Sequence, residues 1–151
     1  MARFAAQLNF GVAEETLNKM TKMVFEGALE SIPIERIKVE FDKAVMSGNL
    51  HRFLEVLHEV YAIEKLQYAF DLESEYLPLS VYSKDDGYEG RIIKIALAYP
   101  DCLTPFPNKL LIGAKLHKLT EYISSVSALN ISVGFLEFYP EEILPYLNQT
   151  L

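Results

Sequence analysis

One short motif in the sequence has the residue types and the spacing of a metal site. Glu55-x-x-His58 follows His51 by one helical turn, so the three side chains share one face of a helix. Di-iron carboxylate bundles use this motif twice, together with two further glutamates. Here the motif occurs once, and His51 and His58 lie about 10 Å apart along a helix axis. We therefore predict a solvated polar face, no bound metal, and histidines that are dispensable.

A second candidate pairs a nucleophile with a base. Cys102 is the only cysteine, and His117 follows it in the chain. A catalytic cysteine needs a base and a third group that orients the base. Two residues do not make that set, and a cysteine in a loop is more often a small apolar packing group. The sequence keeps a Cys102/His117 enzyme only as an alternative.

Two further clusters have an ordinary structural explanation. Asp85, Asp86 and Glu89 lie within five residues, but their spacing does not match a calcium loop and suits the polar tip of a hairpin. Five tyrosines are candidates to line a ligand cup formed by the sheet and helices, although aromatic residues at strand spacing usually belong to the core: Tyr61, Tyr68, Tyr76, Tyr82 and Tyr99. The sequence contains no Gly-rich phosphate loop, CxxC, GxSxG or HExxH motif.

Residues 12–61 have the spacing of amphipathic helices. Apolar residues recur every three or four positions in residues 12–30, 33–48 and 49–61. Pro33 suits the start of the second of these helices, and Ser47-Gly48 suits its end. Asn49 is a suitable cap for the third helix.

The rest of the chain is predicted to form a sheet with one covering helix. Apolar alternation predicts strands at residues 2–10, 66–72, 76–82, 91–99 and 131–139, with 91–99 in the centre of the sheet and Leu97 on its more apolar face. A helix over 109–129 is expected to cover the sheet, and Pro140 is expected to open a short terminal helix. We therefore predict one α+β domain over residues 1–151, with an antiparallel sheet of three to five strands.

The charge balance restricts the expected partners. The chain has 14 basic and 21 acidic residues, a net charge of −7 and a pI near 5.0. No cluster of cations follows a phosphate backbone, and the only notable basic face is Lys109, Lys115, His117 and Lys118. Nucleic acids and anionic membranes are therefore predicted not to be partners. With no signal peptide and no apolar run long enough to span a membrane, we expect a cytoplasmic protein.

Half of the residues are hydrophobic, and the sequence shows no set of residues that would converge on a catalytic site. We therefore predict a non-enzymatic interaction module. Such a module would be an adaptor, an inhibitor or immunity-like protein, or a chaperone-like protein that binds a protein partner or a second copy of itself, without a cofactor. Met and aromatic residues are enriched at interface cores. The predicted interface residues are Met20, Met23, Phe25, Phe53, Leu57 and Tyr61. A small-molecule pocket between sheet and helices is the alternative.

Overall fold

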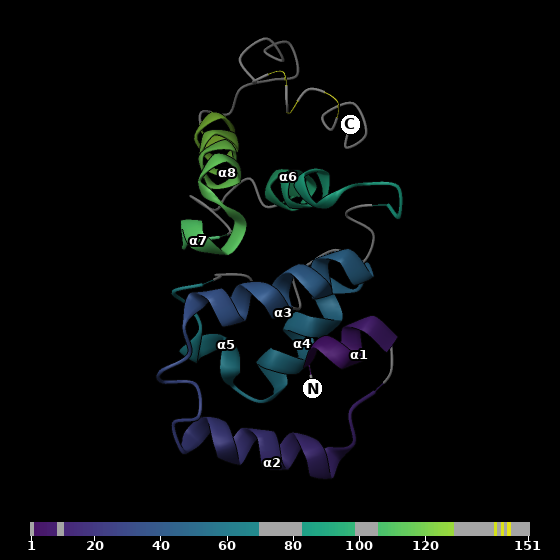
Figure 1. Ribbon diagram of the computed structural model, residues 1–151, viewed down its shortest axis with the longest axis vertical. Coiled ribbons are helices and arrows are strands. Elements are labelled where there is room, and N and C mark those ends of the chain that lie inside the picture. Colours follow the sequence, from purple (N-terminus) through teal and green to yellow (C-terminus); the bar gives the residue numbers. More distant parts are fainter. Residues whose placement is uncertain are drawn as a thin grey trace.

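The computed structural model describes residues 2–8, 11–69, 83–98 and 106–128, together with residues 141, 143 and 145. Within these ranges every regular element is a helix (Figure 1). The helices are α1 (Ala2–Leu8), α2 (Glu14–Phe25), α3 (Ile34–Ser47), α4 (Leu50–Glu59), α5 (Ala62–Lys65), α6 (Tyr88–Ala98), α7 (Lys109–Ile112) and α8 (Ala114–Ala128). The predicted α+β class is therefore wrong.

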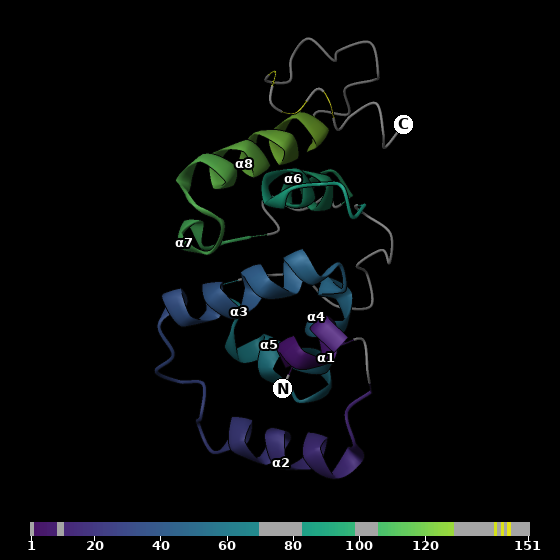
Figure 2. The same ribbon diagram turned by 45° about the vertical axis from the view of Figure 1, so that its right-hand side comes forward.

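Helix α3 lies at the centre of this arrangement. It packs against α1 and α4 on one side and against α6 and α7 on the other. Figures 1 and 2 both show α3 between these two groups, with α2 at the far end of the molecule from α8. The core runs through α3, where Phe41 is fully buried and meets the Phe106 ring edge-on at 5.7 Å between centroids.

The predicted ends of α3 are confirmed. Pro33 precedes the helix with an extended backbone, φ −65° and ψ 146°, which leaves it outside the helix while fixing the start. Gly48 ends it in the left-handed region at φ 85°, where a residue without Cβ is not strained. Helices were also correctly predicted at α2 and α4, although α2 is shorter than residues 12–30.

The predicted central strand at 91–99 is helix α6. Its side chains at Ile92, Ile93, Ile95 and Ala96 are all fully buried. A helix buried on nearly all sides does not show a 3.6-residue pattern, so its apolar run resembles a buried strand. Leu97, predicted to be among the innermost residues, is only half-buried.

Other strand predictions also fail where the structure describes them. Residues 2–8 form α1, and residues 66–69 continue from α5 as turns. The helix predicted at 109–129 is divided at Gly113, whose φ of 91° separates α7 from α8. The predictions for 76–82 and 131–139, and most of that for the terminal helix, lie outside the described residues. Among the helices that are described, none has both the length and the apolar character needed to cross a membrane.

Candidate functional site

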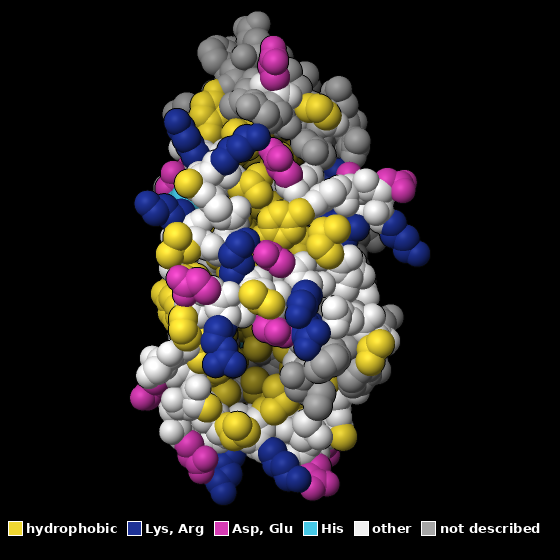
Figure 3. Space-filling model, viewed as in Figure 1, with side chains coloured by type: hydrophobic (Ala, Val, Ile, Leu, Met, Phe, Trp, Pro, Cys, Tyr) yellow, Lys and Arg dark blue, Asp and Glu magenta, His cyan; other side chains and the backbone are white. Residues whose placement is uncertain are grey.

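The outward face of α3 carries cations and apolar side chains together. Arg36, Val39, Lys43 and Met46 follow one another at steps of three or four residues, so they form one stripe, called here the α3 strip. All four are exposed, Val39 by 50% and Met46 by 49%. In Figure 3 dark-blue Lys and Arg side chains lie over α3 together with magenta Asp and Glu side chains, and yellow apolar surface shows between them. The α3 strip is therefore a mixed basic and apolar surface.

The polar side chains on the flanks of α3 are bound to neighbouring elements. Arg3 of α1 donates to Glu40 at 2.6 Å. Lys38 donates to the carbonyl oxygen of Leu111 at 3.0 Å and pairs with Asp42 at 3.1 Å. These contacts fix the rotation of α3 about its axis. The α3 strip consequently faces solvent in a defined orientation.

The cations of the α3 strip are not neutralised by a neighbouring carboxylate. Within the described part of the chain, no ion pair involves Arg36 or Lys43. On α2, by contrast, Lys19 lies 3.1 Å from Glu15 and Lys22 lies 3.9 Å from Glu26. The positive charge on α3 is thus available to a ligand from solution.

A cavity lies at the C-terminal end of the α3 strip. Its volume is about 540 Å³, which is within the range of small-ligand sites. The lining combines the α3–α4 junction with the segment before α6 and the first turns of α6: Met46, Ser47, Gly48, Asn49, Ser83, Lys84 and Arg91. We call it the junction cavity. Met46 belongs to both surfaces, so the α3 strip leads directly into the junction cavity.

Arg91 connects the two sides of the junction cavity. Its guanidinium donates to the carbonyl oxygens of Val45 at 2.8 Å, Asp86 at 2.8 Å and Lys84 at 3.3 Å. The side chain is almost completely buried. These bonds attach residues 84–86 to the last turn of α3. Arg91 therefore sets the shape of the junction cavity.

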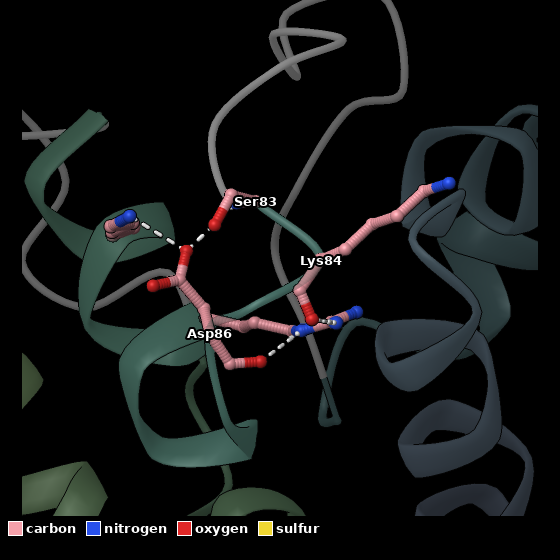
Figure 4. Close-up of polar contacts among 5 residues, drawn as sticks. Ser83, Lys84 and Asp86 are labelled. Carbon is pink, nitrogen blue, oxygen red and sulfur yellow. Dashed lines mark hydrogen bonds and ion pairs between the residues drawn. The ribbon is translucent and has the colours of Figure 1, made fainter.

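The same segment contains a buried ion pair (Figure 4). Lys94 donates to the Asp86 carboxylate at 2.6 Å, and the backbone N–H of Ser83 donates to the same oxygen at 2.8 Å. Burial would raise the pKa of the Asp86 carboxyl, but these hydrogen bonds and the Lys94 charge bring the pKa below its usual value. Asp86 thus holds residues 83–87 in place through its bonds to Ser83 and Lys94. The structure does not support a role for Asp86 in binding a metal cation, because its carboxylate is already paired with Lys94.

The Lys84 side chain is free of this network. It is exposed, and only its carbonyl oxygen accepts a bond from Arg91. Figure 4 shows the side chain extending away from Asp86, toward the neighbouring helical ribbon. Because Lys84 and the α3–α4 junction line one cavity, its ammonium group adds positive charge to the rim.

The predicted absence of a metal at the Glu55-x-x-His58 motif stays a prediction. In the structure, Glu55 of this motif forms an ion pair with Arg52. Arg52 donates to Glu55 at 2.7 Å and lies 3.6 Å from Glu59. His58 is exposed, and burial lowers the pKa of His51, with the Glu55 charge opposing the shift. No group of three potential ligands among the described residues could hold an ion.

The other sequence candidates are not brought together. Cys102 lies outside the described residues, and His117 has its Nδ1 3.7 Å from Glu121. Glu89 is 3.5 Å from Lys115. Of the five tyrosines of the predicted cup, Tyr61 and Tyr68 are exposed and the others lie outside the described residues. Nothing described supports a shared catalytic site or a tyrosine-lined cup.

The six predicted interface residues are placed differently from one another. Phe53 is only 5% exposed and belongs to the core, whereas Met20 and Leu57 are partly buried. Met23, Phe25 and Tyr61 are exposed, and the rings of Phe25 and Tyr61 lie 5.5 Å apart. Whether this set forms an interface stays a prediction.

Comparison with known proteins finds a similarity to an RNA-binding region over residues that include α3. Residues 9–68 match a family model described as "Probable RNA and SrmB- binding site of polymerase A". The Multifunctional CCA protein of Neisseria meningitidis serogroup B is 42% identical over 65 residues, which are 43% of this chain and 16% of that protein. The CCA-adding enzyme of Streptococcus gordonii is 37% identical over 84 residues, 49% of this chain and 21% of that enzyme. No solved structure matches.

These findings correct the functional predictions. The similarity is to an RNA-binding region of a polymerase or nucleotidyltransferase, so the non-enzymatic protein-binding module is wrong, and so is the exclusion of nucleic acid. The chain spans only about a sixth to a fifth of the length of these relatives. The exclusion of nucleic acid was based on the net charge of the whole chain, which does not show that α3 exposes two cations, Arg36 and Lys43. Arg36 and Lys43 are not among the residues predicted from the sequence, although their spacing already places them opposite the apolar stripe of α3.

Proposed function

We propose that this chain is the RNA-binding helical part of a nucleotidyltransferase of the CCA-adding kind, and that the α3 strip contacts the RNA. The observation that carries the proposal is the pair of exposed cations, Arg36 and Lys43, on the outward face of α3 within the matched residues 9–68. The match to an RNA-binding family and the similarity to CCA-adding enzymes support the same reading.

The chemistry of the strip suits a nucleic-acid backbone. Lys and Arg bind phosphates and release condensed counterions, which supplies most of the sequence-independent affinity. Val39 and Met46 present apolar surface between and beside the cations, where a ribose or the face of a base can pack. The site thus offers charge for the backbone and apolar contact for the rest of the nucleotide.

The net charge of −7 does not prevent this binding. At physiological salt, charges farther apart than about 8 Å are largely screened. An RNA phosphate at α3 is therefore affected mainly by the nearest groups. Lys38 contributes less than Arg36 and Lys43, because its ammonium group is already bound to Asp42 and to the Leu111 carbonyl.

The proposal is tested by RNA affinity measured across a salt series. A fluorescein-labelled RNA oligonucleotide, offered both single-stranded and as a duplex, is titrated with the protein and followed by anisotropy. Arg36→Ala/Lys43→Ala is expected to weaken binding and to lower the salt slope by about two, one for each lost phosphate contact. Arg36→Lys/Lys43→Arg should keep most of the affinity.

A matched control separates local contact from overall charge. Lys19→Ala/Lys22→Ala on α2 also removes two positive charges, but from exposed positions outside the α3 strip. We expect it to leave the affinity and the salt slope nearly unchanged. Equal losses in the two double variants would show that only net charge matters, and the absence of any RNA binding would refute the proposed function.

A further inference from the structure

The junction cavity lies where the α3 strip ends, and nothing in the proposed function requires it. Among the described residues, seven line it, and two of these are cationic, Lys84 and Arg91. From the geometry we infer that the junction cavity holds one nucleotide unit of the bound RNA, with its backbone phosphate at Lys84. This inference rests on the proposed function and extends it to a defined position on the RNA.

The size of the cavity fits a nucleotide. Its 540 Å³ exceeds what a bare phosphate or an ordered ion requires, and falls in the range of sites for small organic ligands of roughly 300–1,000 Å³. Met46, half-exposed at the edge, supplies an apolar surface, and Ser47, Asn49 and Ser83 supply polar groups. A phosphate with its ribose and base would use both kinds of lining.

The charges near the opening favour an anion at Lys84. The Lys84 ammonium group has no ion pair among the described residues, and the guanidinium of Arg91 adds a second positive charge to the lining. Of the two neighbouring carboxylates, Asp86 is neutralised by Lys94 at 2.6 Å. Asp85 is exposed and opposes binding, but it does not belong to the lining.

The position of the cavity suits an RNA strand that follows α3. Cations at Arg36 and Lys43 lie on the strip, and Lys84 continues the series past Met46. Arg91 holds the segment of Lys84 against the end of α3 through its bond to Val45. The site is therefore fixed before RNA binds, so binding does not have to order this loop.

The first experiment uses Lys84→Ala, because its side chain is exposed and its carbonyl bond to Arg91 remains. In the RNA titration we expect the salt slope to fall by about one and the affinity to fall about five- to eightfold near 0.1 M salt, the share of one phosphate. Lys84→Arg should restore both. Lys22→Ala is the matched control, and circular dichroism melts should be unchanged in every variant.

The second experiment locates the phosphate on the RNA. A set of RNAs, each with one neutral methylphosphonate linkage, is titrated with wild type and with Lys84→Ala. One linkage should weaken wild-type binding and have no further effect in Lys84→Ala, whereas a different linkage should show this behaviour with Lys43→Ala. That pattern would assign a separate phosphate to each lysine.

The outcomes distinguish the inference from the proposed function. If RNA binding depends on Arg36 and Lys43 but is unchanged in Lys84→Ala, the cavity assignment alone is refuted. If wild type does not bind RNA, both fall. If AMP or inorganic phosphate binds with a dependence on Lys84 that RNA does not show, the cavity serves a free ligand, and the assignment to the RNA backbone is again wrong.

Discussion

Asp86→Asn should strongly destabilise the protein, because Asp86 is the counter-charge of a buried cation near the junction cavity. The Asp86 and Lys94 side chains are 11% and 6% exposed, and they are 2.6 Å apart. Asparagine keeps the shape and can still accept the Ser83 N–H bond, but it leaves the Lys94 ammonium group buried without a counter-charge. Breaking a buried pair in this way costs about 3–5 kcal/mol.

The companion variants test whether this cost comes from the uncompensated charge. Lys94→Met removes the cation and fills the same space with apolar atoms, so Lys94→Met/Asp86→Asn has no buried charge. Replacing a buried pair by apolar or neutral groups is often close to neutral. The double variant should therefore be more stable than Asp86→Asn by about 2 kcal/mol or more, a difference that urea unfolding followed by circular dichroism can measure.

The pH dependence has a definite sign. The folded pKa of Asp86 lies below its unfolded value of about 3.8. The ion pair therefore contributes its full stabilisation when the pH is above the unfolded pKa of about 3.8. This contribution is lost as the pH falls from the unfolded pKa through the folded pKa. The difference in unfolding free energy between wild type and Asp86→Asn should shrink in this acid range. A loss below 1 kcal/mol at neutral pH, or a difference independent of pH, would refute the reasoning.

Three further changes test the core, the end of α3 and the unused motif. Phe41→Ala removes a fully buried ring that contacts Phe106, and urea unfolding should show a loss of about 3–5 kcal/mol. Gly48→Ala meets no atom within 4 Å but must keep φ +85°, so it should cost about 1–2 kcal/mol, whereas Gly11→Ala, with equal space and no positive φ, should cost nothing. His58→Ala should leave stability within about 0.5 kcal/mol of wild type, and metal analysis should give the same result for both proteins.

The sequence predicts the helices whose ends carry their own signals. Pro33 and Gly48 bound α3 because each fixes a backbone angle that does not depend on packing. Asn108 likewise precedes α7, and its side chain accepts from the Leu110 N–H at 3.0 Å. Asn49 is the cap residue of α4, but its side chain makes no cap bond, and the Ser47 hydroxyl accepts from its N–H instead.

The sequence does not predict α6, because tertiary packing removes the pattern. Ile92, Ile93, Ile95 and Ala96 are buried together, and even Arg91 and Lys94 on the same helix are nearly inaccessible. Their charges are satisfied by carbonyls and a carboxylate from residues 84–86 and from α3. These tertiary partners cannot be predicted from local spacing, so the apolar run with residues on both faces resembled a buried central strand.

The incorrect exclusion of RNA and the incorrect strand prediction at α6 have the same cause, since both depend on tertiary contacts that the sequence does not show. A net charge describes the whole chain, but binding depends on which charges are already paired. On α2 each lysine faces a glutamate one turn away, whereas on α3 the carboxylates Glu40 and Asp42 are bound to Arg3 and Lys38. Pairing on the flanks of α3 thus leaves Arg36 and Lys43 exposed and outside the ion pairs of the described residues, with Glu35 as the one exposed carboxylate of α3 that is in no ion pair there. An acidic protein can therefore present a basic surface wherever its carboxylates are engaged in holding the helices together.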